Sequence, residues 1–166
     1  MILTRRFMLL AGISALAGCD TNSKFRTYRG PEVTRIIVNK GAREMHLMHH
    51  DRPLKSYRVE LGFAPEGHKQ FEGDGKTPEG EYFIDRRNPN SSFHLSLGIS
   101  YPNEADIAYA QAMGMEPGGD IFIHGEPNVL AFLSPDWTAG CISVTNREME
   151  DIYAMVRDGT PITLNA

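Results

Sequence analysis

The chain has 166 residues, a length that suits one domain of ordinary size with a single hydrophobic core. It carries 17 basic and 21 acidic residues, which give a formal net charge of −4 at pH 7. A net negative charge is unfavourable for contact with phosphate backbones, so the composition argues against a nucleic-acid partner.

The first 18 residues have the pattern of an export signal. Arg5 and Arg6 form a basic segment, and the apolar run at 7–16 is too short to predict a membrane span. The sequence LAGC at 16–19 resembles a bacterial lipobox, although an ordinary signal peptide with an incidental cysteine is the alternative. We therefore expect a lipoprotein-type signal peptide over 1–18, a lipid anchor on Cys19, and an exported, periplasmic protein held at the membrane.

The next segment, 19–32, is polar and shows no hydrophobic periodicity. We expect a lipidated tether there, without a core, followed by one catalytic domain over 33–166. Apolar residues then recur with strand spacing at 36–38, 45–48 and 57–61, and turn-forming residues separate these segments. This pattern predicts an antiparallel β-meander.

Further elements follow in chain order. A long glycine-rich loop spans 62–80, and loops of this length in compact domains are often functional. Strand patterns occur at 81–85, 93–97, 121–123 and 161–164, and an alanine-rich helix is expected at 104–113. The residues Thr145 to Glu148 match a helix capping box. The fold class is therefore expected to be mainly β with one or two short α-helices.

Two residues that can carry chemistry, His124 and Cys141, each lie at the end of an apolar strand beside a glycine. If Cys19 is lipidated, Cys141 is the remaining thiol of the domain and has no disulfide partner. Imidazole can accept the thiol proton, and the N–H groups of Gly140 and Cys141 could stabilise an oxyanion. On residue types alone, a buried inert cysteine and a buried structural histidine remain the alternative.

The residues around His124 and Cys141 favour the catalytic interpretation over the structural one. His124-Gly125 followed by Thr138-Ala139-Gly140-Cys141-Ile142 resembles the signature of the L,D-transpeptidase catalytic domain, the YkuD-type fold. The segment KTPEGEY at 76–82 resembles the T-P-x-G segment of the same family, and SYPN at 100–103 with Thr145-Asn146 resembles its YafK-like branch.

The resemblance implies a β-rich fold that needs no cofactor and acts on peptidoglycan stem peptides. A cysteine of such an enzyme attacks the carbonyl of meso-diaminopimelate in a tetrapeptide stem and releases the terminal D-alanine. The thioester then passes to an amine, which gives a 3–3 crosslink, amino-acid exchange or attachment of an envelope protein. Carried over to this chain, Cys141 is the nucleophile, His124 the general base, and Gly140 with Cys141 the oxyanion-hole backbone.

Substrate-binding residues are expected around this pair, namely Gly125, Thr138 and Ser143. Many relatives carry histidine and arginine where this chain has Ala139 and Ser143, and that arginine is expected to bind a substrate carboxylate. Arg86 and Arg87 are candidates to replace it, or are solvated surface charges. His94, on a predicted strand, is either a substrate contact or a half-buried core residue.

Two other functions stay open at this point. One is a YafK-like hydrolase that uses water in place of the amine and releases protein or peptide from peptidoglycan. The other is a non-catalytic peptidoglycan-binding lipoprotein. No metal site is predicted, because no cysteine or carboxylate completes a ligand set with His46, His49 and His50.

Overall fold

The computed structural model describes residues 23–127 and 134–166, so the predicted signal peptide and Cys19 lie outside the described residues. The strands are β1 (Arg35–Asn39), β2 (Glu44–His49), β3 (Arg52–Arg58), β4 (Gly80–Asn88), β5 (Ser96–Ile99), β6 (Phe122–His124), β7 (Ile142–Ser143) and β8 (Pro161–Asn165). The helices are α1 (Glu104–Ala112) and α2 (Asn146–Met155). In these two ranges, neither helix combines the length and the apolar character that a membrane crossing requires.

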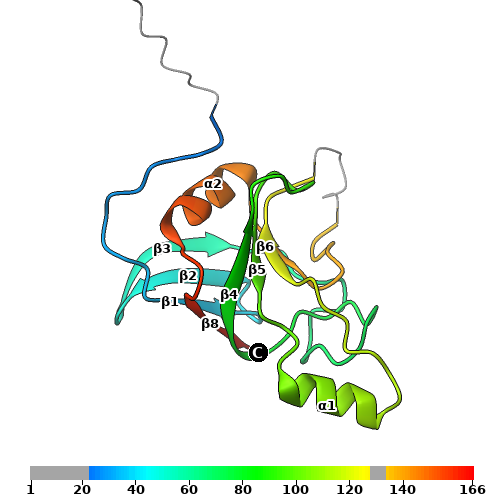
Figure 1. Ribbon diagram of the computed structural model, residues 1–166. Coiled ribbons are helices and arrows are strands. Elements are labelled where there is room, and N and C mark those ends of the chain that lie inside the picture. The colour runs from blue at the N-terminus through cyan, green and yellow to red at the C-terminus, as the bar shows by residue number, and fades with distance from the viewer. Residues whose placement is uncertain (1–22, 128–133) are drawn as a thin grey trace, which may run out of the picture.

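The described strands form one sheet in the order β3-β2-β1-β8-β4-β5-β6-β7. The predicted meander is confirmed, because β1 pairs with β2 and β2 with β3, both antiparallel. The C-terminal strand β8 enters the middle of the sheet, parallel to β1 and antiparallel to β4. The long strand β4 joins two groups of strands that run in different directions (Figure 1). The expectation of a mainly β fold with two helices is thus confirmed.

Helix α2 lies in the angle between these two groups of strands (Figure 1). Its residues Met149, Ile152 and Met155 are buried, so one side of the helix packs on the core. The capping box is present: Glu148 N–H donates to Thr145 Oγ1 at 3.3 Å, and Thr145 N–H donates to Glu148 Oε2 at 3.0 Å. The helix start is therefore set by the local sequence.

The structure corrects three boundaries. β3 begins at Arg52, in the segment expected to be a separator, and the turn lies just before it. His94 does not lie on a strand, because it adopts φ 72° and β5 starts at Ser96. The apolar strand expected beside Cys141 is β7, which is only two residues long and pairs in parallel with β6.

A buried lysine holds the glycine-rich loop against the sheet. Lys40 is 2% exposed, and its ammonium donates to the carbonyls of Gly67 at 2.6 Å and Thr77 at 2.8 Å. The same group forms an ion pair with Glu79 at 2.8 Å. Both ends of the loop are thereby attached to the end of β1.

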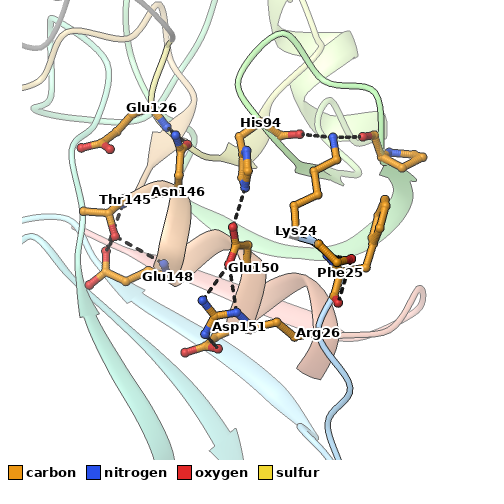
Figure 2. Close-up of polar contacts among 12 residues, drawn as sticks. Lys24, Phe25, Arg26, His94, Glu126, Thr145, Asn146, Glu148, Glu150 and Asp151 are labelled. Carbon is orange, nitrogen blue, oxygen red and sulfur yellow. Dashed lines mark hydrogen bonds and ion pairs between the residues drawn. The ribbon is translucent and has the colours of Figure 1, made fainter. Parts of the chain in front are cut away.

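The segment at 23–32, part of the predicted tether, contains no helix or strand, and its residues Lys24 and Arg26 are docked on the domain (Figure 2). Lys24 Nζ donates to the carbonyls of Pro89 at 2.6 Å and His94 at 3.0 Å. Arg26 donates to Glu150 at 2.6 Å and to Asp151 at 2.7 Å. Glu150 in turn pairs with the imidazole of His94 at 2.9 Å. The segment therefore joins α2 to the loop at 89–95.

This arrangement predicts that Glu150→Gln loosens the loop at 89–95, because a neutral amide weakens both charged contacts of Glu150. We expect the amides of that loop, and the Gly125 amide that donates to Phe93 O at 3.0 Å, to exchange hydrogen roughly tenfold faster. Glu72→Gln is the matched control, since Glu72 is exposed and makes no side-chain hydrogen bond within 23–127 and 134–166. Equal exchange in the two variants would contradict the role given to Glu150.

Candidate active site

His124 and Cys141 are brought to one face of the sheet by the pairing of β6 with β7. His124 is the last residue of β6 and pairs with Ser143, while Ile123 pairs with Ile142. Cys141 directly precedes Ile142, so it lies level with Phe122. Alternate residues of a strand share a face, and Phe122 and His124 therefore project to the side on which Cys141 lies.

A cavity of about 280 Å³ opens on this face and is lined by both residues. The Cys141 thiol is half-buried and donates to the Asp120 carbonyl at 3.5 Å. Among the described residues, no hydrogen bond joins Sγ to the imidazole in this conformation. The remaining lining comes from β4 to β6 and the connecting loops: Asn88, Ser91, Ser92, Phe93, Ser96, Asp120 and Phe122.

The orientation of the His124 ring selects the nitrogen that can act as a base. Nδ1 lies 2.6 Å from the Gly125 carbonyl, and because a carbonyl can only accept, Nδ1 carries the proton in this contact. Nε2 is then unprotonated and able to accept a proton. The ring packs in a cluster with Phe93, with centroids 4.5 Å apart, and Trp137, with centroids 5.6 Å apart. These contacts restrict its rotation.

Burial shifts both groups toward their neutral forms. It lowers the pKa of His124, against a smaller opposite effect of the Gly125 carbonyl. It raises the pKa of the Cys141 thiol, while the backbone of Phe122 acts in the opposite direction. At neutral pH the pair is thus a thiol and a neutral imidazole, an arrangement suited to general-base activation rather than to a preformed thiolate.

Thr138 forms hydrogen bonds within the loop that precedes Cys141. Thr138 is 3% exposed, donates to the Cys141 carbonyl at 2.7 Å and accepts the Gly140 N–H at 3.1 Å. The Gly140 N–H is therefore already engaged, and Thr138 does not line the cavity. The Cys141 N–H has no intramolecular partner in the described ranges and is the candidate oxyanion donor.

Gly140 has a conformational role in this loop. Its φ is 132°, and a Cβ at this position would lie 2.6 Å from the Lys76 carbonyl. Only glycine tolerates both conditions. The glycine-rich loop thus packs directly behind the cysteine, which explains why the Lys76 segment and the cysteine motif occur together.

Gly125 and Ser143, which the sequence predicts to bind substrate, contact His124 and each other in the structure. The Gly125 carbonyl orients His124, and Ser143 Oγ donates to the same carbonyl at 3.5 Å. Ser143 is absent from the lining of the Cys141 cavity and belongs to a second cavity of about 440 Å³. That cavity lies beyond Trp137 and is lined by Arg58, Glu60, Glu126, Ser134, Pro135, Val144, Thr145 and Glu148.

The side chains of Arg87 and His94 contact helix α2 and not the Cys141 cavity. The Arg87 guanidinium donates to the carbonyls of Tyr153 and Val156 at the end of α2 and lies 3.9 Å from the Tyr153 ring centroid. His94 pairs with Glu150 on the same helix. Neither residue lines the Cys141 cavity, so the structure assigns both to the support of α2 and its neighbouring loop.

Sequence reasoning did not identify Phe93 and Asp120 as site residues. Phe93 stacks on His124, but in the sequence it looks like any apolar strand residue. Asp120 accepts from the thiol through its carbonyl, a contact that side-chain type does not reveal. The one available signal was position, because Asp120 lies two residues before β6, the strand that carries His124.

Comparison with known proteins identifies relatives of this arrangement. A family model described as the L,D-transpeptidase catalytic domain, YkuD, matches residues 33–164. The putative L,D-transpeptidase YafK of Escherichia coli K12 is 32% identical over 105 residues, which cover 62% of this chain and 37% of that protein.

Two solved structures have a similar fold. The helical cell shape determining protein Pgp2 from Campylobacter jejuni gives a TM-score of 0.64 at 25% identity, over 82% of this chain and 49% of that one. Bd1075 of Bdellovibrio bacteriovorus gives a TM-score of 0.57 at 22% identity, over 80% of this chain and 47% of that one. The chain therefore spans about half or less of the length of these relatives.

Proposed function

The chain belongs to the L,D-transpeptidase catalytic-domain family, and from this premise we propose that it transfers peptidoglycan stem peptides through a thioester on Cys141. One observation carries the proposal: Cys141 and His124 line the same cavity, with Nδ1 of His124 held by Gly125 and Nε2 left as the base. A general base beside a thiol is the arrangement that nucleophilic catalysis requires.

The first half-reaction forms the thioester. His124 Nε2 takes the thiol proton while Sγ attacks the carbonyl of the residue before the terminal D-alanine. The Cys141 N–H faces the oxyanion of the tetrahedral intermediate. The C–N bond then breaks, and His124 returns the proton to the departing amine of D-alanine. For the thiol to reach Nε2, it must turn away from the Asp120 carbonyl.

The second half-reaction consumes the thioester. A neutral acceptor amine attacks the acyl carbon while His124 takes its proton; the C–S bond then breaks, and His124 gives the proton to sulfur, which restores the thiol. The cavity beyond Trp137 supports an amine acceptor rather than water, because it adjoins His124 through Ser143 and carries the carboxylates of Glu60, Glu126 and Glu148. Carboxylates favour a cationic amine near the thioester.

The test is mass spectrometry of products from the purified full chain, wild type and Cys141→Ala, incubated with disaccharide-tetrapeptide with and without an added D-amino acid. We expect loss of D-alanine and amine-dependent exchange in the wild type, and neither product in the variant. Cleavage that ignores the amine would instead identify the YafK-like hydrolase. The absence of any Cys141-dependent product, also on protein-linked fragments, would favour a non-catalytic peptidoglycan-binding lipoprotein.

The location of the enzyme is part of the proposal and rests on the sequence pattern at 1–19. We propose export to the periplasm and lipidation of Cys19, which would hold the enzyme at the membrane beside its substrate. Metabolic labelling with a fatty-acid analogue, in the wild type and in Cys19→Ala, tests this directly, and equal labelling of the two would contradict it.

A further inference from the structure

Arg86 reaches the rim of the Cys141 cavity by crossing a strand that has no side chain at that point. In the sheet, Arg86 on β4 pairs with Gly98 on β5, and Gly98 pairs with Phe122 on β6. A Cβ at Gly98 would lie 2.5 Å from Arg86 Cγ, so a larger residue would block this path. The guanidinium extends over Gly98 to Phe122, and its central carbon lies 4.5 Å from the ring centroid.

Two carboxylates of different exposure hold the guanidinium at this rim. Nη1 donates to Asp85 at 2.9 Å, and Nη2 donates to Asp120 Oδ1 at 3.0 Å. The Asp120 side chain is 91% exposed, and its backbone has φ 54°, a region that residues other than glycine seldom adopt. Ion pairs with so exposed a partner contribute little stability. Another carboxylate can therefore replace Asp120 on Arg86.

Arg86 supplies the positive charge that an anion would need at the rim of the cavity. Apart from Asp120, the side chains that line the cavity are neutral at pH 7 when His124 is unprotonated. Arg86 contacts two of the lining residues, Asp120 and Phe122, from outside. Guanidinium binds a carboxylate through two parallel hydrogen bonds, which fixes orientation as well as position.

We propose that Arg86 binds a carboxylate of the acyl-donor peptide at the rim of the cavity, and that the Asp120 carboxylate occupies this place in the free protein. The inference rests on the proposed function, because it takes the stem peptide as donor. Two carboxylates of that peptide have the required chemistry: the C-terminus of the last D-alanine and the free carboxylate of the diaminopimelate side chain. The experiment distinguishes them.

The test measures Kd by titration calorimetry in a Cys141→Ala background of the full chain, so that it does not depend on turnover. The ligands are disaccharide-tetrapeptide, the same compound with a C-terminal amide, and the compound amidated on the diaminopimelate side chain. We expect Arg86→Gln to raise the Kd of the unmodified donor about 10- to 100-fold. One of the two amidated ligands should bind the Cys141→Ala protein with a similarly raised Kd. Adding Arg86→Gln should not raise the Kd of that ligand further.

Four further variants, one of them a control, separate a carboxylate contact from a general disturbance. Arg86→Lys keeps the charge and should restore part of the affinity, and Gly98→Ala should weaken binding as Arg86→Gln does. Asp120→Asn should tighten binding by about two- to fivefold, since it removes the competing carboxylate. Arg157→Gln makes the same charge change at a side chain that is 80% exposed and far from the cavity lining, and should leave Kd unchanged.

An Arg86→Gln effect that is absent, or equal for all three ligands, overturns the inference while the proposed function stands. The experiment also detects the opposite outcome. If the wild type turns over no donor but binding still depends on the carboxylate, only the proposed function fails. No binding of any ligand to either protein would contradict both.

Discussion

Replacing His124 by glutamine is expected to lower kcat/KM for the tetrapeptide donor by about 10²- to 10⁴-fold, the usual contribution of a general base. Glutamine keeps a polar side chain but cannot accept the thiol proton. The measurement is D-alanine release under steady-state conditions. The thermal transition of the variant should stay within a few degrees of the wild type, which would show that the loss is chemical.

The pH dependence makes this prediction specific. Burial lowers the pKa of His124 from its ordinary value of 6.5, so the base form is present above the lowered pKa and the acid limb of the wild-type profile should lie below pH 6.5. Burial raises the pKa of the thiol above its ordinary value of 9.0. The residual rate of His124→Gln should therefore lack the acid limb and rise into the alkaline range, where the thiol ionises unaided. A variant rate that is flat with pH would contradict base catalysis by His124.

Replacing Lys40 by methionine is expected to lower the free energy of unfolding by about 3–5 kcal/mol, because it removes one partner from a buried charged network. The change leaves the Glu79 carboxylate and the carbonyls of Gly67 and Thr77 without their hydrogen-bond donor, because each of them accepts from Lys40 Nζ within 2.8 Å. For a domain of this size we expect the melting temperature to fall by about 10 °C or more.

Lys55→Met is the matched control for this experiment. Lys55 lies on β3 with its side chain 50% exposed, and its nearest carboxylate, that of Asp151, is 3.7 Å away. Such a surface pair contributes at most about 1 kcal/mol, so its loss should move the melting temperature little. If the two variants melt alike, Lys40 does not hold the glycine-rich loop as the structure indicates.

The sequence predicted the elements of the fold correctly where the local hydrophobic pattern also determines which face of the element is buried. The strand spacing at 36–38 and 45–48 and the capping box at Thr145 match the structure, because one face of each element is buried. The start of β3 escaped prediction because its exposed first half has no apolar alternation, and the length of β7 because two residues show no period.

The sequence pointed to Cys141 and His124, which line one cavity, but not to most of the residues around them. The sequence motif identifies Cys141 and His124 as candidates. It does not predict that the Gly140 N–H donates to Thr138 Oγ1, or that the Arg87 guanidinium donates to a carbonyl at the end of α2. Arg86 and Arg87 are neighbours on β4, where successive side chains take opposite faces, and a register irregularity between Ile84 and Arg86 decides which one faces the cavity. That irregularity depends on the partner strand, which the sequence alone does not identify.

The docking of Lys24 and Arg26 also limits the distance between the domain and Cys19. Cys19 precedes Lys24 by five residues, which span at most about 18 Å when fully extended. With the lipid that we propose on Cys19, the point where Lys24 joins the domain would stay within about 18 Å of the cysteine that carries the acyl chains. The enzyme would then reach only the layer of peptidoglycan nearest its membrane, and release of Lys24 and Arg26 from the domain would extend that working range.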